Sequence, residues 1–319
     1  MIKDSFGRPL LNLRISVTQR CNLHCPYCHR EGEEKRVGDS ATEMTLEEIV
    51  RIVRVAVSLG MRKVKITGGE PLLRPDILDI VKGIAEIRDL KDLSMTTNGN
   101  LLSKYAEDLH RNGLNRVNVN IPTLDNETYH KLLGGNLQDV LKGIKSAIDA
   151  GLDPVKLNML ILKGVNDRDI LEMMRFASEN SVVLQLIELE PVNISSAYYE
   201  RYHRALDEIE SELKGKAEKV ETRSDMQNRR IYHLPKVDVE VIRPIENTEF
   251  CAKCTRLRVT SDGKLKPCLM KKTDLVDVLT PIRNGEDDKK VIELFKEACR
   301  KREPFYKAFC PANLNSASG

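Results

Sequence analysis

The stretch Thr18-Gln-Arg-Cys-Asn-Leu-His-Cys-Pro-Tyr-Cys-His29 is the most informative part of this sequence for predicting the fold. It places three thiols, Cys21, Cys25 and Cys28, within eight residues, too close together for any pair to bridge distant parts of a fold. This spacing suits one polynuclear iron–sulfur centre, because several thiolates must converge on it. Three ligands leave one iron of a four-iron cube open for a reacting molecule, as catalytic zinc sites keep one open position. On spacing alone, a zinc knuckle or a structural group of reduced cysteines remains open.

Apolar strand patterns and amphipathic helical patterns alternate around this run. Strands are expected at residues 11–18, 63–67, 92–97, 116–121, 154–162 and 182–189. Six strand–helix units in succession require a parallel sheet with helices outside it, and six is fewer than the eight of a closed barrel. The pattern predicts an α/β fold, an incomplete (β/α)6 TIM-like barrel.

The regular alternation ends after Pro191. A charged helix is expected over 198–214, a polar and mixed segment over 215–236, short strands at 238–243, 255–260 and 263–268, and a last charged helix over 286–301. We therefore expect a partial barrel over residues 1–192 and a smaller C-terminal α+β domain over residues 193–319.

A second group of three cysteines, Cys251, Cys254 and Cys268, lies in the C-terminal part with no fourth cysteine nearby. Its spacing allows a zinc site completed by His233 or Cys310, and it allows a second three-cysteine [4Fe-4S] cluster.

Two arginines lie between these cysteines. If residues 255–260 form a strand, Arg256 and Arg258 share one face of it, because side chains alternate along a strand. Two guanidinium groups beside a metal site suit a polyphosphate, which they can bind bidentately. Solvated surface arginines are the alternative interpretation.

The overall composition limits the classes of function. The 319 residues include 51 Lys and Arg against 48 Asp and Glu, a net charge of +3, which is not typical of a nucleic-acid-binding protein. No run approaches the ~20 apolar residues that span a membrane, and no secretory signal opens the chain, so we expect a cytoplasmic protein. In that reducing compartment, eight cysteines favour metal binding over disulfides.

The first cysteine run, with Tyr27 before its last cysteine, resembles the signature of the radical S-adenosylmethionine superfamily. Together with the Arg-Ile-Ser-Val-Thr segment before it and the later Cys-x-x-Cys-x-Arg-x-Arg motif, it resembles the GTP 3',8-cyclase family of molybdenum cofactor biosynthesis over about residues 5–305. The resemblance implies the radical S-adenosylmethionine type of partial barrel, with a second cluster in the C-terminal domain. It also implies conversion of GTP to (8S)-3',8-cyclo-7,8-dihydroguanosine 5'-triphosphate through a 5'-deoxyadenosyl radical, the first step of molybdopterin synthesis.

The resemblance implies roles for individual residues. Two [4Fe-4S] clusters would be held by Cys21, Cys25 and Cys28 and by Cys251, Cys254 and Cys268. S-adenosylmethionine would contact Tyr27, Gly69, Asn120 and Glu190, and GTP would contact Arg14, Lys65, Thr96, Lys156, Arg256 and Arg258. No side chain is expected as a catalytic group, because radical chemistry needs no protein nucleophile. Expected partners are GTP, a second copy of the chain, a downstream cyclic pyranopterin monophosphate synthase and an electron donor, with no membrane and no nucleic acid.

The chain departs from the usual pattern of this family at some of these positions. Asn120 replaces a frequent Ser, Glu190 replaces a common Met, and Lys65 replaces a frequent Arg, which keeps the charge but loses the planar fork. The chain ends Asn315-Ser-Ala-Ser-Gly319, where the family often ends in a Gly-Gly pair that reaches the active site.

Two other functions remain open on the sequence. A radical S-adenosylmethionine peptide maturase also carries auxiliary clusters after a partial barrel, but it predicts a peptide-docking module before the barrel, where this chain has only about ten residues. A zinc-stabilised module that binds nucleic acid through its arginines would hold zinc in place of iron.

Overall fold

The computed structural model describes residues 1–33 and 43–306. Within these residues a single 12-stranded sheet runs through the molecule in the order β12-β11-β10-β1-β2-β3-β4-β5-β6-β9-β8-β7. The first six strands are β1 (Asn12–Ser16), β2 (Lys63–Thr67), β3 (Asp92–Thr97), β4 (Arg116–Asn120), β5 (Lys156–Leu160) and β6 (Val183–Ile187). The others are β7 (Lys219–Arg223), β8 (Arg229–Leu234), β9 (Val237–Ile242), β10 (Arg256–Val259), β11 (Lys264–Lys266) and β12 (Val276–Asp277).

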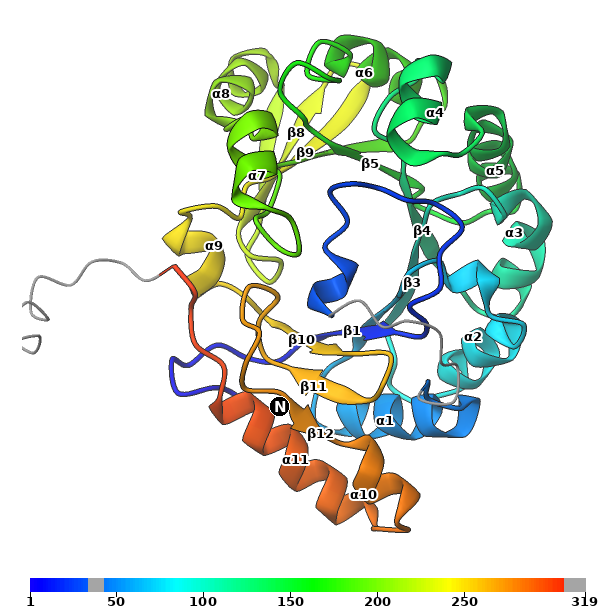
Figure 1. The fold of residues 1–319 in the computed structure, drawn as a ribbon, viewed down its shortest axis with the longest axis vertical. Coiled ribbons are helices and arrows are strands. Elements are labelled where there is room, and N and C mark those ends of the chain that lie inside the picture. The colour runs from blue at the N-terminus through cyan, green and yellow to red at the C-terminus, as the bar shows by residue number, and fades with distance from the viewer. Residues whose placement is uncertain (34–42, 307–319) are drawn as a thin grey trace, which may run out of the picture.

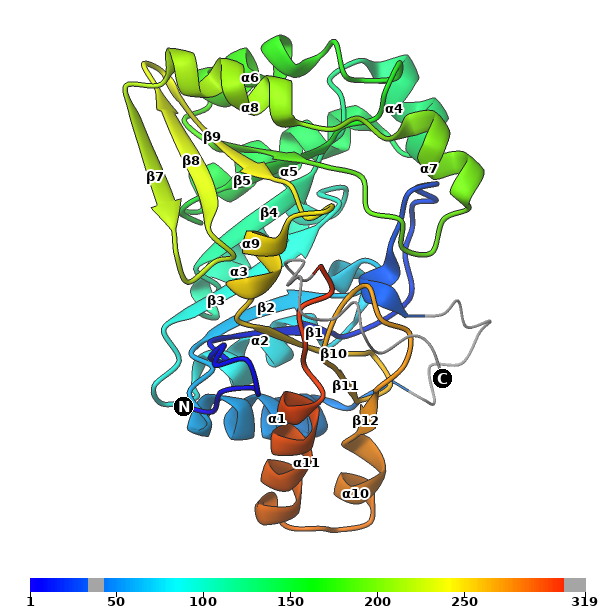
Figure 2. The ribbon, with the colours of Figure 1, turned by 90° about the vertical axis from the view of Figure 1, so that its left-hand side faces the viewer.

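Helices cover the outside of this curved sheet (Figures 1 and 2). Those of the first part are α1 (Leu46–Ser58), α2 (Ile77–Ala85), α3 (Leu102–Arg111), α4 (Asn126–Leu133), α5 (Leu137–Asp149) and α6 (Ile170–Glu179). The later ones are α7 (Ser196–Tyr202), α8 (Asp207–Lys216), α9 (Thr248–Ala252), α10 (Leu279–Arg283) and α11 (Asp288–Arg300). Two short 3-10 turns are η1 (Arg30–Gly32) and η3 (Pro71–Leu73). None of these helices is both long and apolar enough to cross a bilayer.

The first six strands are consecutive parallel neighbours, and the sheet does not close on itself. The predicted open partial barrel is therefore confirmed. Parallel neighbours need a crossover that covers one face of the sheet, and the intervening helices provide it on the outside.

The strands of the C-terminal part extend this same sheet at both of its edges. β9 pairs in parallel with β6 and carries the antiparallel strands β8 and β7, while β10 pairs in parallel with β1 and carries β11 and β12. Strands β7 and β8 lie in the segment 215–236, for which the sequence predicted only a polar mixture. The helix expected over 198–214 is two helices, α7 and α8, separated by residues 203–206. The division into domains at residue 192 stays a prediction.

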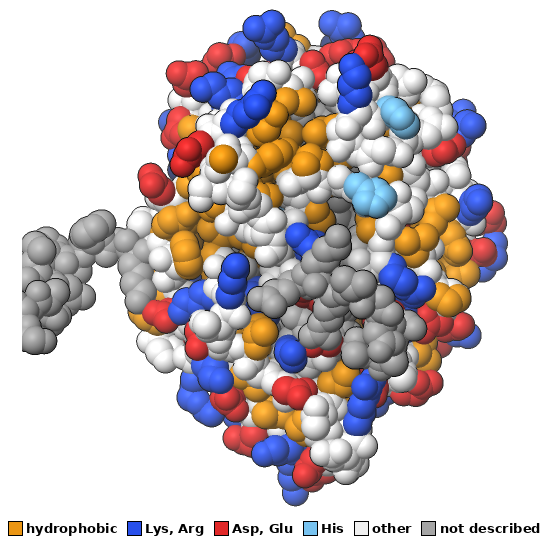
Figure 3. All heavy atoms as spheres, in the orientation of Figure 1, with side chains coloured by type: hydrophobic (Ala, Val, Ile, Leu, Met, Phe, Trp, Pro, Cys, Tyr) orange, Lys and Arg blue, Asp and Glu red, His pale blue; other side chains and the backbone are white. Residues whose placement is uncertain are grey.

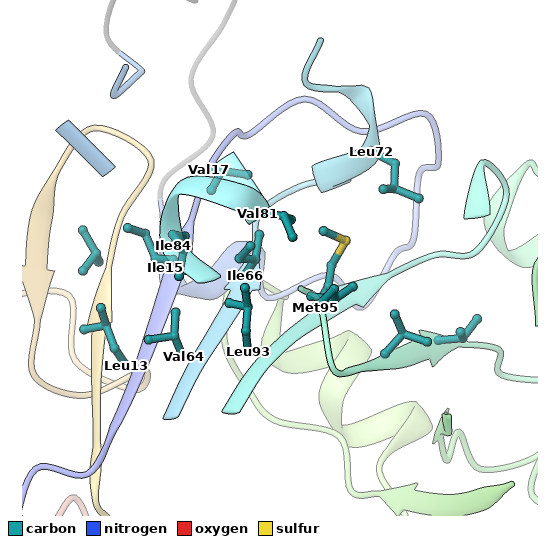
Figure 4. Packing of buried hydrophobic residues seen from close by; sticks show 14 of the residues in the cluster. Leu13, Ile15, Val17, Val64, Ile66, Leu72, Val81, Ile84, Leu93 and Met95 are labelled. Carbon is teal, nitrogen blue, oxygen red and sulfur yellow. The ribbon is translucent and has the colours of Figure 1, made fainter. Parts of the chain in front are cut away.

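The strand side chains that point outward form the apolar core with the helices. Figure 4 shows these residues of β1, β2 and β3 packed beside α2: Leu13, Ile15, Val64, Ile66, Leu93 and Met95 from the strands, with Val81 and Ile84 from the helix. All of them are at most 1% exposed. Since side chains alternate along a strand, the residues between them point into the barrel, and many of those are polar.

The first helix shows how local sequence sets the boundaries of these elements. Thr45 and Glu48 form the predicted capping box, in which the Thr45 amide donates to Glu48 Oε2 at 2.7 Å and the Glu48 amide donates to Thr45 Oγ1 at 3.3 Å. The helix ends before Gly60, whose φ of 104° lies in a region that favours glycine.

Candidate functional site

The barrel interior holds a cavity of about 300 Å³. All sixteen site residues predicted from the sequence line it: Arg14, Cys21, Cys25, Tyr27, Cys28, Lys65, Gly69, Thr96, Asn120, Lys156, Glu190, Cys251, Cys254, Arg256, Arg258 and Cys268. They come from both parts of the chain, because β10 lies beside β1 and carries the second cysteine region to the same interior. Figure 3 shows Lys and Arg interspersed among Asp and Glu toward the periphery of this face of the molecule.

The first cysteine triplet lies on the loop that follows β1. Its three thiols form no disulfide; Cys21 and Cys28 are exposed and Cys25 is half-buried. The backbone amide of Cys28 donates to the Cys25 carbonyl at 3.1 Å. Burial, followed by the neighbouring Cys28 and Cys21 thiols, raises the pKa of Cys25 to about 12. Because these groups repel one another as thiolates, a cationic iron centre would stabilise the arrangement.

Gly68 and Gly69 hold this loop against the end of β2. A Cβ on Gly68 would lie 2.6 Å from the Thr18 carbonyl, and one on Gly69 would collide with the Arg20 carbonyl. The Gly69 amide donates to the Thr18 carbonyl at 2.7 Å. The two glycines therefore let the cysteine loop pack directly on the strand end, and Gly69 also lines the cavity.

Glu70 follows these glycines and lies next to the candidate site. The sequence predicted no role for it. It is fully buried and accepts hydrogen bonds from the amides of Leu72 (3.1 Å) and Asn98 (2.7 Å) and from Thr97 Oγ1 (2.7 Å). Burial raises its pKa to about 7. Glu70 thus joins the ends of β2 and β3 directly beneath the first cysteine loop.

The second triplet faces the same cavity from the end of α9 and the segment after β11. Cys251, Cys254 and Cys268 are half-buried free thiols. Burial raises the pKa of Cys251, whereas the pKa of Cys254 is lowered because Arg302 and Arg256 outweigh the opposite effect of burial.

The donor sets of both triplets fit a cluster of several irons. In residues 1–33 and 43–306, no three His, Cys, Asp or Glu side chains converge on a point where one metal ion could bind. In a four-iron cube each thiolate binds its own iron, so the three sulfurs need not meet at one point. His233 does not complete the second triplet, since it lies on β8 outside the cavity lining and its Nδ1 is 2.8 Å from Asp238 Oδ1. Cys310 and the tail 315–319 lie outside the described residues, and Cys299 is buried in α11 away from the cavity lining.

Three of the predicted GTP contacts form a row across adjacent strands. Arg14 on β1 is the register partner of Arg258 on β10 and of Lys65 on β2. Register partners in a parallel sheet share a face, so these three side chains enter the cavity side by side. Glu31 of η1 contacts two of them, with its carboxylate oxygens 3.2 Å from Arg14 Nη1 and 3.3 Å from Arg258 Nε.

Lys65 and Arg256 line the cavity and have no carboxylate partner among the described residues. Lys65 Nζ donates to Asn118 Oδ1 at 2.5 Å, and the guanidinium group of Arg256, a residue that is 8% exposed, has neither a hydrogen bond nor an ion pair within residues 1–33 and 43–306. Burial, followed by nearby cations, holds the pKa of both side chains well below the usual values. Of the described residues, eleven Lys and Arg line the cavity against five Asp and Glu. The excess of buried positive charge favours an anionic ligand.

Lys156 belongs to a second cationic group at the β5–β9 side of the barrel. The fully buried Glu240 on β9 contacts Lys156 Nζ (3.1 Å), Arg223 Nη1 (3.0 Å) and Arg229 Nε (3.3 Å). Burial lowers the pKa of Arg229 to about 10. Neither arginine was predicted from the sequence, because both lie in the segment where β7 and β8 were not recognised. The basic character of that segment was the signal that could have pointed to them.

The remaining predicted residues lie around the rim and walls of the same cavity. Thr96 on β3 is half-buried, and Asn120 at the end of β4 accepts a hydrogen bond from Asn158 Nδ2 at 2.9 Å. Tyr27 and Glu190 are half-buried, and burial raises the pKa of Tyr27 well above its usual value. The roles of all these residues in binding stay predictions.

Comparison with known proteins gives two family matches that together span most of the chain. The model of the radical SAM superfamily matches residues 15–177, and the Molybdenum Cofactor Synthesis C model matches residues 182–308. Two curated relatives, each named "Probable GTP 3',8-cyclase", are from Pyrococcus horikoshii (49% identity over 313 residues, 96% of this chain and 98% of that protein) and Thermococcus kodakarensis (47% over 314 residues, 96% and 100%).

Solved structures show the same fold at low sequence identity. Streptococcus suis SuiB bound to S-adenosylmethionine has a TM-score of 0.66 and 19% identity, covering 93% of this chain and 67% of that one. Native anSMEcpe with bound AdoMet has a TM-score of 0.57 and 18% identity, covering 84% of this chain and 77% of that one. At such identities the likeness supports the fold alone, whereas the matches along nearly the whole sequence define the relationship. The chain belongs to the radical SAM superfamily and, within it, to the GTP 3',8-cyclase family.

Proposed function

We propose that this chain converts GTP to (8S)-3',8-cyclo-7,8-dihydroguanosine 5'-triphosphate, the first step of molybdenum cofactor biosynthesis. The observation that carries the proposal is that two separate cysteine triplets and an excess of cations line a single cavity. In the reaction a hydrogen atom leaves ribose C3', a bond forms between C3' and guanine C8 as the C8–N7 double bond is lost, and one electron from the donor and one proton complete the 7,8-dihydroguanine at N7. When bound, the clusters and S-adenosylmethionine supply the 5'-deoxyadenosyl radical and an open iron for the substrate.

The protein's contribution is to bind and orient the nucleotide. A triphosphate carries several negative charges. The row of Arg258, Arg14 and Lys65, together with Arg256, whose side chain has no ion pair in the described part of the chain, offers cations with few competing carboxylates. Arginine forks can hold phosphate oxygens bidentately, which limits the orientations available to the ribose and base.

The sheet also isolates the reaction from water. The apolar layer between strands and helices closes the outside of the barrel, and Tyr27 and Leu23 of the first cysteine loop contribute to the cavity wall. Shielding of this kind suits a carbon-centred radical, because it prevents side reactions while the new bond forms.

The other partners belong to the same proposal. We infer that two copies of the chain associate, that a cyclic pyranopterin monophosphate synthase consumes the product, that an electron donor reduces the first cluster, and that the protein works in the cytoplasm. S-adenosylmethionine is assigned to Tyr27, Gly69, Asn120 and Glu190, which line the cavity.

A labelled substrate tests the function. The chain reconstituted anaerobically with iron and sulfide should hold about eight irons. With S-adenosylmethionine, a reductant and GTP deuterated at C3', it should form 5'-deoxyadenosine that carries deuterium. If 5'-deoxyadenosine forms at the same rate without GTP, or never carries deuterium, GTP is not the substrate. A colourless protein holding zinc would instead support the zinc-stabilised module.

A further inference from the structure

We propose that Asp4, Arg8 and Arg302 form a buried support that positions the second cysteine triplet for its cluster. The inference rests on the proposed function only in assigning a cluster to that triplet. These three residues are named here the terminal triad, because they bring together the first residues of the chain and the segment after α11.

Asp4 is the centre of the terminal triad. Its Oδ2 lies 2.8 Å from Arg8 Nε and 3.0 Å from Arg302 Nη1, and its Oδ1 accepts the backbone amide of Arg8 at 3.0 Å. The exposed fractions of the three side chains are 0% for Asp4, 6% for Arg8 and 1% for Arg302. A carboxylate this deeply buried holds both guanidinium groups in fixed positions.

Each arginine of the terminal triad donates to the backbone of a different cysteine. Arg8 Nη1 lies 2.8 Å from the Cys251 carbonyl, and Arg302 Nη2 lies 2.6 Å from the Cys254 carbonyl. Hydrogen bonds from a charged donor are stronger than neutral ones, so this turn of backbone is held at two points. Such outer contacts typically orient the residues that bind a metal centre.

The two ends of the described chain meet at this place. Figure 1 shows the blue N-terminal segment beside the red segment that follows α11, and Arg302 Nη1 also donates to the Arg8 carbonyl at 3.3 Å. None of the hydrogen bonds or ion pairs of the terminal triad reaches the first cysteine triplet. Its effect should therefore be confined to the second cluster.

The charges of the terminal triad also match an anionic cluster. Two guanidinium groups share one carboxylate, which leaves one positive charge in excess in a buried place. Arg302 Nε has no hydrogen-bond partner among the described residues. Three thiolates that bind a cluster would bring negative charge next to this excess, and nearby charge and hydrogen bonding tune the reduction potential of such clusters.

The test compares Arg302→Met with Arg300→Met, which removes an exposed arginine two residues away on α11. After anaerobic reconstitution, Arg302→Met should hold about four irons per chain and Arg300→Met about eight. The electron paramagnetic resonance signal of the first cluster should still change on adding S-adenosylmethionine in both variants. About eight irons in Arg302→Met, or equal loss of both clusters, would overturn the proposal.

A second variant covers the case in which Arg302→Met does not fold, as judged by circular dichroism. Arg302→Lys keeps the charge and loses the planar fork, so it should restore part of the second cluster and shift its resonance signal relative to the unmodified chain. An unchanged signal at full iron content in Arg302→Lys would reject the positioning role. None of these readouts uses GTP, so a chain that holds both clusters but ignores GTP overturns the proposed function and leaves this inference standing.

Discussion

Arg14 and Arg258 are register partners on the parallel strands β1 and β10, although one lies near the start of the chain and the other near its end. Like charges placed side by side on a sheet destabilise it, and the structure offsets this pair with the buried carboxylate of Glu31. Glu31 lies three residues after Cys28, so the loop of the first triplet also stabilises the cations of the proposed substrate site.

Removing the Glu31 charge should destabilise the chain. In Glu31→Gln both guanidinium groups lose their shared anion, and we expect the free energy of unfolding to fall by about 3 kcal/mol. Denaturant titration of the cluster-free protein measures this change. Glu47→Gln, on an exposed residue of α1, serves as the matched control and should stay within about 0.5 kcal/mol of the unmodified chain.

The same contact predicts an acid transition. Arg14, His29 and Arg258 outweigh the opposing effect of burial and lower the pKa of Glu31 from 4.5 to about 2. A lowered carboxyl pKa contributes stability that is present above the unfolded-state pKa and is lost as the pH falls. As the pH falls from 4.5 to about 2, the free energy of unfolding of the cluster-free chain should therefore decrease more steeply than that of Glu31→Gln. If the two proteins show the same dependence of unfolding free energy on pH, Glu31 does not have this role.

Arg258→Lys should weaken GTP binding. Lysine keeps the positive charge but cannot hold two phosphate oxygens with one planar group, so we expect a Kd about 10- to 100-fold higher. Equilibrium binding to the reconstituted chain measures the effect, with iron content as the check that both clusters remain. Arg54→Lys, on an exposed position of α1, should bind GTP normally, and equal affinities in the two variants would remove Arg258 from the substrate site.

The two cysteine triplets should be separable by mutation. Cys251→Ser should retain about four irons and the response to S-adenosylmethionine but lose GTP binding, whereas Cys25→Ser should lose that response and keep the second cluster. Iron analysis and electron paramagnetic resonance distinguish the two variants. Complete loss of iron in both would mean that the triplets hold one shared centre.

Gly69→Ala should disturb the first cysteine loop through packing alone. Its new Cβ would meet the carbonyls of Arg20 and Gln19, so the loop must move away from β2, and the iron content should fall from about eight to about four per chain. Gly215→Ala is the control, since a Cβ at that position in α8 meets no atom within 4 Å. Full iron content in Gly69→Ala would show that the loop tolerates the displacement.

Much of the fold and site could be predicted because their signals are local. Alternating apolar residues marked the first six strands, and the same period of two placed Arg256 and Arg258 on one face of β10, where both line the cavity. The two cysteine triplets were visible in the sequence, although their spacing alone left zinc open beside an iron–sulfur cluster. The polar segment 215–236 carried no such period, so β7 and β8, and with them Arg223 and Arg229, were missed.

The sequence by itself determined the first six strands, the cap of the first helix and the positions of the two cysteine triplets, because period, capping and spacing are properties of neighbouring residues. Only the tertiary structure decided that β10 pairs with β1, that Glu31 lies between Arg14 and Arg258, and that Asp4 joins Arg8 to Arg302. Those contacts join residues far apart in the chain, and which edge strand or buried charge is available to a distant segment depends on how all the other segments have packed.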